Sequence, residues 1–532
     1  MEQPLTYLRQ RADDDWLIGC ESHQFYHLTE QLLEQFTQLS LRGTPPKILL
    51  AESDPWRFLA AFLAAVAANC PVFLGNANWV QREWQEVFNL VQPDLIVGQG
   101  IGDWGKAIAI RTTTNQQPTT TNHQPTTNNH QPTTNNQQPP TNNHQPTTNN
   151  QQPTTNNQQQ IMIPTGGSSG QIRFTIHTWQ TLMTSVSGFY QYFGCKPVHS
   201  FCVLPLYHVS GLMQFLRSLT TGGRMAILPF KALIAGEGRD INPTGFFISL
   251  VPTQLQRLLS ADAANWLSRF QTVLLGGAPA WQSLLDEARR HRIRLSPTYG
   301  MTETASGVVT LRPEAFLTGN NSCGQVLPHA RVTVRSATGE ILGANETGII
   351  TIQAHSLALG YYTPAETILS HWVDAPLLRK NGKMVNGEYS DGRDINLKSQ
   401  LQNLQSDDLG FFDQQGYLTI IGRRSNKIIT GGENVFPAEV EAAILASQLV
   451  ADVGVIGLSD RYWGQAVTAV YVPRSPDISP DILQKAVADK LCKFKRPKYW
   501  VAVDAMPRNG QGKLNYEQLK ELAISCLLMA NG

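Results

Sequence analysis

Short apolar segments alternate with a longer apolar segment along the first hundred residues. The runs Lys47–Ala51, Val72–Leu74 and Asp94–Val97 have the length of buried strands. Between the first two, Pro55–Ala68 has the length and composition of a buried helix. Strands that alternate with helices in this way predict βαβ units and a parallel sheet.

The alternation resumes after residue 160. Short apolar runs predict strands at Phe201–Leu204, Met225–Leu228, Phe246–Leu250, Thr272–Leu275 and Arg294–Leu295. Helices are predicted at Thr253–Leu259 and Trp281–Arg290. From Ala330 to Tyr362 the pattern changes to short alternating strands, which predicts a β-rich subdomain.

A further change in pattern near Arg424 predicts a domain boundary. Helices are expected at Pro437–Ala446, Pro480–Leu491 and Tyr516–Leu528, with strands at Val450–Gly457, Ala466–Val472 and Tyr499–Val503. We therefore predict an α/β protein whose large N-terminal domain, residues 1–424, has stacked, mainly parallel sheets with helices and a β-rich subdomain. Residues 425–532 are predicted to form a small α+β C-terminal domain.

Residues 112–160 interrupt the compact pattern. They consist almost wholly of Gln, Pro, Thr, Asn and His, and Gln-Pro recurs every seven residues from 117 to 152. The period does not predict a coiled coil, because no position of the repeat is apolar and every repeat contains proline. We predict a disordered low-complexity surface loop without a catalytic role, and a partner-binding role stays open.

Composition narrows the function classes. The 532 residues carry a formal net charge of +1, which gives no electrostatic reason to expect nucleic acid or an anionic membrane. The seven cysteines form no Cys-x-x-Cys pair, which favours free thiols in a reducing compartment. The N-terminus lacks a secretory apolar stretch, and Phe58–Phe73 is too short to span a membrane. We predict a cytoplasmic protein without membrane insertion, and a homo-oligomer stays open.

The segment Tyr299–Thr304 reads Tyr-Gly-Met-Thr-Glu-Thr and follows a predicted strand that ends at Leu295. It places a flexible residue, two hydroxyls and one carboxylate on a single predicted turn. A hydroxyl such as that of Thr302 can hold a nucleotide phosphate, and the Glu303 carboxylate can bind magnesium. An ordinary turn after a strand is the alternative.

A glycine- and hydroxyl-rich loop follows the predicted strand Ile161–Pro164. Its backbone N–H groups and hydroxyls suit a phosphate, and it comprises Thr165, Gly166, Gly167, Ser168, Ser169 and Gly170. It is not a Walker loop, because no Gly-Lys-Ser/Thr follows. The alternative is a flexible join between the repeat and the domain.

Three further residues stand at or after predicted strand ends, where sites of α/β proteins form. His208 follows an apolar strand in the run Pro205–Leu212, and Gly276 and Gly277 follow another, where small residues let a flat ring lie against the backbone. Arg217 interrupts an apolar run. It either extends its charge to the surface or binds a second carboxylate of a substrate.

The last candidates lie in the C-terminal third. Asp408 precedes a predicted hairpin at Phe411–Ile421 and can accept both hydroxyls of a ribose, while Asp407 is interpreted as a solvated neighbour. Arg423 can also reach a ribose. Lys513 lies on a glycine-flexible loop and is either a mobile point charge or a solvated surface lysine.

Taken in order from residue 165 to 513, these segments resemble the adenylate-forming superfamily, the acyl-CoA synthetases and their relatives. The resemblance implies ATP, magnesium and coenzyme A as cofactors, with Glu303 as the metal ligand and Lys513, His208 and Thr302 in catalysis. It assigns residues 165–170 to pyrophosphate, although Gly166 replaces a usual serine and Arg173 stands near the usual lysine. The nucleotide would contact the following residues: Gly276, Gly277, Tyr299, Gly300, Thr302, Asp408 and Arg423.

The resemblance also implies a mobile C-terminal domain. Its hinge would lie at Arg424–Asn426, with Ser425 where many relatives carry Asp or Lys. The loop of Gly431, Gly432 and Glu433, just before the predicted helix at Pro437, would then form a pantetheine tunnel for a second half-reaction.

Three stretches are similar to the 2-succinylbenzoate–CoA ligases of menaquinone and phylloquinone synthesis. They are Leu250–Leu259, His208–Gly211 and Gly422–Val435. The implied substrate-binding residues are His208, Ser210, Arg217 and Gly276, with Arg217 as the partner of a spare carboxylate. The alternatives are a ligase for another aryl or medium-chain acid, a non-catalytic nucleotide- or acyl-binding relative and, least favoured because no carrier segment follows residue 532, a carrier-loading adenylation domain.

Overall fold

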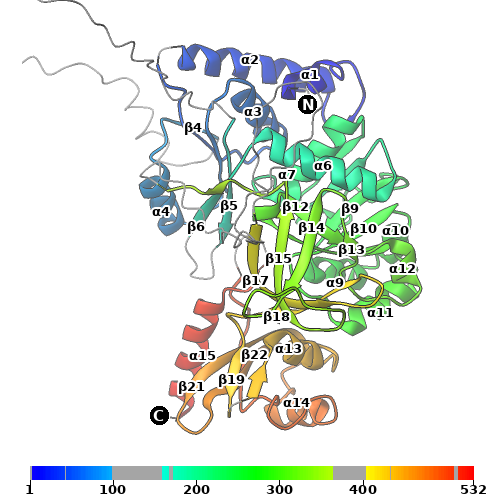
Figure 1. Cartoon of the computed structure of the whole chain (residues 1–532), viewed down its shortest axis with the longest axis vertical. Helices are drawn as coiled ribbons and strands as arrows, with labels where there is room; N and C mark the ends of the chain where they lie inside the picture. The colour runs from blue at the N-terminus through cyan, green and yellow to red at the C-terminus, as the bar shows by residue number, and fades with distance from the viewer. Residues whose placement is uncertain are drawn as a thin grey trace, which may run out of the picture.

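The structure is a computed structural model, and it describes residues 3–41, 43–98, 159–166, 172–363, 403–431, 433–508 and 513–531. Figure 1 shows a large region built from the first three quarters of the chain and a smaller group of C-terminal elements at the lower end of the molecule. The predicted repeat lies almost wholly outside the described residues.

One sheet of the large region is assembled around the first predicted βαβ unit. Its strand order is β16 (Gly360–Tyr361), β6 (Ile172–His177), β5 (Ile161–Gly166), β3 (Val72–Leu74), β2 (Ile48–Leu50) and β4 (Leu95–Val97). Strands β4, β2, β3 and β5 are parallel, and β6 and β16 add antiparallel strands at one edge. The crossover helix α3 (Pro55–Ala67) starts where Asp54 accepts a hydrogen bond from the backbone N–H of Arg57.

The second sheet has eight strands. Their order is β1 (Leu17–Ile18), β8 (Met225–Ile227), β7 (His199–Cys202), β9 (Phe246–Leu250), β10 (Thr272–Leu275), β11 (Leu295–Met301), β12 (Ser306–Thr310) and β13 (Gln325–Val326). The strands from β1 to β11 are parallel, and β12 and β13 are antiparallel additions. The predicted stack of mainly parallel sheets is confirmed.

Helices join the two sheets. One hydrophobic core contains buried residues of β2, β3 and β5 from the first sheet and of β7 and β8 from the second, together with helices between them. The helices of the large region are α1 (Pro4–Arg9), α2 (Ser22–Ser40), α3, α4 (Gln81–Val91), α6 (Trp179–Phe193), α7 (Val209–Thr221), α8 (Phe230–Ile234), α9 (Pro252–Ser260), α10 (Ala264–Ser268), α11 (Gln282–Arg290) and α12 (Pro313–Leu317).

The predicted β-rich subdomain is an antiparallel sheet of four strands, in the order β14 (Ala330–Arg335), β15 (Gly348–Ala354), β17 (Asn403–Phe412) and β18 (Leu418–Arg423). The expectation that Asp407 and Asp408 precede a hairpin is wrong. Both lie inside β17, because the pairing with β18 runs on to Asp408 and Arg423.

The C-terminal elements form a sheet with helices. The strands are β19 (Ile428–Thr430), β20 (Glu433–Val435), β21 (Val450–Asp460), β22 (Gly464–Pro473) and β23 (Tyr499–Ala502), and the helices are α13 (Pro437–Leu445), α14 (Pro480–Val487) and α15 (Tyr516–Asn531). Two hydrophobic cores are made from these elements and their connections alone. The boundary at residues 424 and 425 stays a prediction that these separate cores support.

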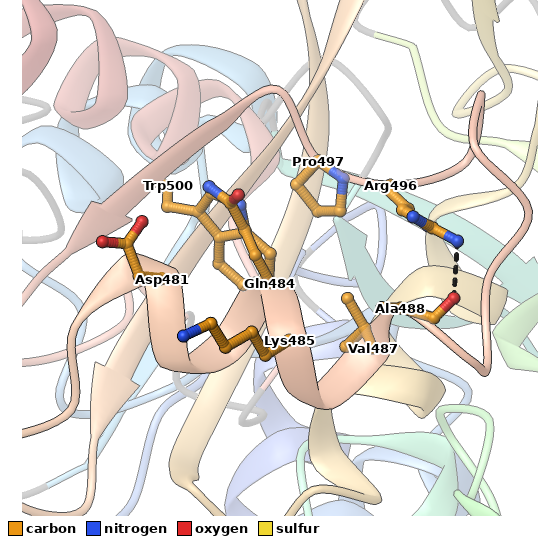
Figure 2. Close-up of a pocket in the computed structure, with 8 residues that line it drawn as sticks. All are labelled: Asp481, Gln484, Lys485, Val487, Ala488, Arg496, Pro497 and Trp500. Atoms are coloured by element: carbon orange, nitrogen blue, oxygen red, sulfur yellow. Dashed lines mark hydrogen bonds between the residues drawn. The ribbon is translucent and has the colours of Figure 1, made fainter.

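A hollow of about 340 Å³ lies on the C-terminal unit between α14 and the segment that leads into β23 (Figure 2). Arg496 at its rim donates hydrogen bonds to the carbonyl oxygens of Ala488 and Leu491. The hollow contains none of the predicted site residues. Among the described residues, no helix is long and apolar enough to cross a membrane.

Candidate active site

Several predicted site residues of the large region follow strands that end at one edge of the eight-stranded sheet. Strands β7, β9, β10 and β11 are parallel neighbours, so their carboxyl ends lie along the same edge. His208 follows β7, Gly276 and Gly277 follow β10, and Glu303 follows β11.

The segment Tyr299–Thr304 is not one turn. Strand β11 continues to Met301, and only Thr302–Thr304 form a short 3-10 helix. The prediction that the strand ends at Leu295 is wrong because β12 returns beside β11 and pairs Met301 with Ser306. At this reversal Ala305 and Ser306 have φ values of 53° and 97°, a left-handed conformation that is strained for residues other than glycine.

The backbone carbonyls of residues 302 to 305 are held one by one. Each oxygen accepts a hydrogen bond from a different residue: Thr302 from His177 Nε2 (2.8 Å), Glu303 from the Ala358 N–H (2.8 Å), Thr304 from Ser356 Oγ (3.0 Å) and Ala305 from Ser185 Oγ (2.6 Å). We call residues 302–305 the anchored turn. Its donors come from three separate parts of the large region, which fixes the turn in place.

The Glu303 carboxylate stands on the anchored turn with a phenol beside it. The Tyr361 hydroxyl donates to Glu303 Oε1 over 2.7 Å, and the Arg173 guanidinium lies 5.8 Å from the centre of the Tyr361 ring. No group of three or more His, Cys, Asp or Glu side chains among the described residues is placed to hold a metal ion. A single carboxylate fits magnesium, which is commonly bound through one or two carboxylates and the phosphates of its nucleotide.

Asp408 lies between two potential partners. Its Oδ2 accepts a hydrogen bond of 2.8 Å from the Tyr299 hydroxyl, and its Oδ1 lies 3.4 Å from Arg423 Nε. Burial, with Asp408 as the second cause, raises the pKa of Tyr299 well above its usual value, so the phenol keeps its proton. A carboxylate held in this way can accept hydroxyls of a ribose.

Lys513 comes from the C-terminal unit to the same place. The residue is exposed. Loss of hydration is nevertheless the largest cause that lowers the pKa of its ammonium, and Arg423 lowers it further, whereas Glu303 and Asp408 raise it. Lys513 is a surface lysine, as one of the two interpretations expects, but Glu303, Asp408 and Arg423 of the large region act on it electrostatically.

His208 precedes the first residue of α7 and is 6% exposed. Burial lowers its pKa to about 3, and the charge of Lys513 acts in the same direction, so the imidazole is neutral at pH 7. It can therefore contribute hydrogen bonds but no charge. Ser210 lies in the first turn of the same helix, where its carbonyl accepts a hydrogen bond from Gln214.

Arg217 is buried, so the alternative in which it extends to the surface is wrong. The residue is 5% exposed, its Nη2 donates to Ser306 Oγ over 3.1 Å, and its guanidinium lies 3.9 Å from the centre of the Phe189 ring. Its buried Nε and both ring nitrogens of His329 have no hydrogen-bond partner in the described part of the chain. Burial lowers the pKa of Arg217 to about 9, which still leaves it charged at pH 7. A buried cation with an unused donor suits an anionic group.

Two glycines of the site are required by the backbone. Gly277 has a φ of 82°, and a Cβ on Gly300 would come within 2.1 Å of the Ser306 carbonyl oxygen. Gly276 follows β10 directly, and a Cβ there would lie 2.9 Å from a methyl carbon of Thr298. At these positions a larger side chain would either clash with neighbouring atoms or strain the backbone.

The predicted phosphate loop is described only at its start. Thr165 and Gly166 end β5 and pair with Arg173 and Ile172 of β6, so the loop joins two strands of a hairpin. Gly167, Ser168, Ser169 and Gly170 lie outside the described residues, as does Gly432.

Gly431 and Glu433 lie in the C-terminal unit. Gly431 has a φ of 58° and donates its N–H to the Trp463 carbonyl over 2.8 Å, while Glu433 begins β20. Asp407, interpreted from the sequence as a solvated neighbour, has a side chain that is 39% exposed, which agrees with that interpretation. Its Oδ2 accepts hydrogen bonds from both the backbone N–H and the hydroxyl of Ser425, so it holds the predicted hinge.

Comparison with known proteins agrees with this geometry. Residues 24–362 match the AMP-binding enzyme family, and residues 439–513 match the AMP-binding enzyme C-terminal domain. The 2-succinylbenzoate–CoA ligase of Geobacillus sp. (strain WCH70) is 31% identical over 363 residues, which are 67% of this chain and 68% of that relative. The ligase of the same name from Bacillus velezensis is 34% identical over 320 residues, and this match spans 60% of this chain but only 59% of the relative.

Solved structures share the fold. O-succinylbenzoate coenzyme A synthetase from Bacillus subtilis, in complex with AMP, aligns with a TM-score of 0.73 at 22% identity and covers 97% of this chain and 98% of its own. ATP-bound MatB from Rhodopseudomonas palustris aligns with a TM-score of 0.70 at 21% identity over 93% of each chain. The extent of the family match shows that this chain belongs to the AMP-binding enzymes, the adenylate-forming superfamily.

Proposed function

We propose that this chain is an ATP-dependent acid–CoA ligase that converts 2-succinylbenzoate to 2-succinylbenzoyl-CoA in menaquinone or phylloquinone biosynthesis. The family match and the two ligases of that name support the proposal. The observation that carries it is that Glu303 and Asp408 of the large region both act electrostatically on Lys513 of the C-terminal unit, at the edge of the eight-stranded sheet where Glu303 follows β11.

The nucleotide would lie along that edge. Thr165, Gly166 and the four residues after them would hold the phosphates, Asp408 and Arg423 the ribose, and Gly276, Gly277, Tyr299 and Gly300 the adenine side. When bound at Glu303 with ATP, magnesium would neutralise phosphate charge. Tyr361 would hold the Glu303 carboxylate in place through the hydrogen bond described above.

In the first half-reaction a carboxylate oxygen of the acid attacks the α-phosphorus. The bond to pyrophosphate breaks, and an acyl-adenylate forms. The Lys513 ammonium would stabilise the negative charge that accumulates on the α-phosphate, and the Thr302 hydroxyl would donate to the same group. Neutral His208 orients the carboxylate without adding charge.

In the second half-reaction the C-terminal unit turns about Ser425 and withdraws Lys513. The loop of Gly431, Gly432 and Glu433 then lines the approach of CoA. The CoA sulfur attacks the acyl carbon, the thiol proton passes to solvent and AMP leaves with the electron pair of the acyl–oxygen bond. One pocket thereby serves two reactions in turn.

Arg217 is the proposed partner of the spare carboxylate. It is buried and cationic, and it reaches Ser306 beside the anchored turn. Ser210 lies on the same helix, about two turns before it. An acid with two carboxylates satisfies both the reacting position and this second cation, which a simple aryl or medium-chain acid does not.

The test is AMP release with ATP, CoA and 2-succinylbenzoate, run beside benzoate and octanoate. We expect 2-succinylbenzoate to be the preferred acid. Equal or faster turnover of the simple acids would replace the acid assignment with a general aryl or medium-chain ligase. Absence of ATP–pyrophosphate exchange with every acid would instead indicate a non-catalytic relative. The substrate is a small molecule in each enzymatic case, and the cytoplasmic location stays a prediction.

A further inference from the structure

One donor to the anchored turn is a buried histidine, whereas the others are a backbone N–H and two serine hydroxyls. His177 ends β6, is fully buried and follows apolar residues such as Phe174 and Ile176. Its Nε2 lies 2.8 Å from the Thr302 carbonyl oxygen, and its Nδ1 lies 3.1 Å from the Thr181 hydroxyl. Thr181 belongs to the capping box of α6, so the ring is fixed from both sides.

We propose that His177 is a positioning residue that holds Thr302 and Glu303 in the orientation needed for phosphate and magnesium. The proposal rests on the proposed function for ATP and magnesium but not for the identity of the acid. His177 acts through the backbone of the turn and not by touching the nucleotide.

The chemistry of the ring fits this role. A carbonyl oxygen only accepts hydrogen bonds, so Nε2 carries the proton. Burial lowers the pKa of His177 to about 4, and the hydrogen bond to Thr302 opposes that shift only in part, so the donor is a neutral imidazole at pH 7. A purely packing position between apolar neighbours would be filled better by an apolar side chain, because burying a polar ring without need is unfavourable.

Loss of this donor would loosen the turn without unfolding it. The Thr302 carbonyl also accepts a hydrogen bond of 3.1 Å from the backbone N–H of Ala305, so one partner remains. Ala358, Ser356 and Ser185 still hold the next three carbonyls. Thr302 would lose its hydrogen bond to β6. The side chain of the next residue, Glu303, would then no longer be held in one orientation.

The experiment compares His177→Met, which removes the donor at similar volume, with His177→Gln, whose amide can still donate to Thr302. The readout is the magnesium concentration that gives half-maximal binding of a non-hydrolysable ATP analogue, measured by calorimetry without any acid. We expect His177→Met to raise this concentration about tenfold, as loss of a residue that orients a metal ligand commonly does, and His177→Gln to raise it much less.

Ser356→Ala is the second variant, in case His177→Met does not fold. It removes the donor to the Thr304 carbonyl with a small change in volume, and we expect a shift in the same direction of about threefold, the equivalent of one weakened hydrogen bond. Unchanged magnesium midpoints in the folded variants would overturn the proposal, even if their thermal stability fell. Absence of analogue binding in the unmodified protein would instead overturn the proposed function.

Discussion

The anchored turn and the Lys513 loop bring opposite charges to one site but are held in different ways. Every carbonyl of the turn accepts a hydrogen bond from the large region. At the base of the Lys513 loop, Arg508 pairs with Leu514 and forms an ion pair with Asp452, and all three residues belong to the C-terminal unit. Lys513 itself is linked to Glu303, Asp408 and Arg423 by charge interactions.

The difference indicates that the two regions have separate roles. The carboxylate that would bind magnesium is built into the large region, whereas the lysine is carried to it by a unit with its own cores. A charge that is delivered can also be withdrawn. This suits an enzyme that needs the lysine for one half-reaction and the emptied space for the next.

The largest effect is expected from Lys513→Met. Loss of an electrostatic stabiliser should slow acyl-adenylate formation by about 100- to 1,000-fold, because the ammonium acts on the transition state. Thioester formation from supplied acyl-adenylate should change little, since the lysine has then been withdrawn. ATP–pyrophosphate exchange and CoA-dependent AMP release measure the two steps separately.

The matched control is Lys493→Met, which changes an exposed lysine of the same unit and should leave both rates unchanged. Equal slowing of both half-reactions by Lys513→Met would remove the distinction between a built-in and a delivered charge.

Arg217→Met tests a second built-in charge. The preference for 2-succinylbenzoate over benzoate should fall by roughly 30-fold or more, because truncation of one member of a buried charge pair costs about 2 kcal/mol or more. Turnover of octanoate in the same variant is the internal control and should hold within a small factor. Retained preference for the doubly charged acid would show that Arg217 does not bind the spare carboxylate.

The pH dependence of the free energy of unfolding tests whether His177 is held neutral beside the anchored turn. The pKa of folded His177, about 4, lies below the usual 6.5, so below pH 6.5 the unfolded chain binds a proton that the folded chain does not. This contribution is complete above pH 6.5 and is lost as the pH falls toward 4. Between pH 7 and 5.5 the unmodified protein should lose about 1 kcal/mol more stability than His177→Gln.

Unfolding midpoints of the two proteins at both pH values provide the measurement. His208 and His329 also have pKa values lowered by burial, but they are present in both proteins and so drop out of the difference. Identical pH slopes would show that His177 is not held neutral by the fold.

The smallest effect is expected at the hinge. Asp407→Asn weakens the acceptor of the Ser425 N–H and hydroxyl, so the C-terminal unit should leave its present orientation more readily. We expect adenylation to slow and thioester formation to quicken by about threefold each, the equivalent of part of one hydrogen bond. A parallel fall in both rates would mean that Asp407 serves stability and not the hinge.

Patterns local in sequence predicted most of the fold. Strands β3, β9 and β10 have the bounds expected from their apolar runs, because short apolar runs of this length that are rich in β-branched and aromatic residues favour buried strands. Strand β11 was predicted too short, since its extension depends on pairing with β12. The residues Tyr299–Met301 include a glycine and continue no apolar run, so they give no local signal of that pairing.

Sequence motifs identified the residues of the candidate site but not the residues that hold them in place. Glu303, Asp408 and Lys513 were identified in the sequence, and the structure brings them together. His177, which holds Thr302 from 125 residues away, was missed because such contacts are set by the packing of β6 against the turn. The one local feature of the sequence that points to His177 is a histidine at the end of an apolar strand.

The most direct test is the distance between the two regions during the reaction. One dye would be placed at exposed Cys492 and the other at Leu41→Cys, another exposed position, with the remaining cysteines replaced. The account predicts one energy-transfer value with ATP and magnesium and a different one when CoA meets a stable acyl-adenylate analogue, with the Lys513→Met protein following the same change. A single value under both conditions would contradict a lysine that is delivered and withdrawn.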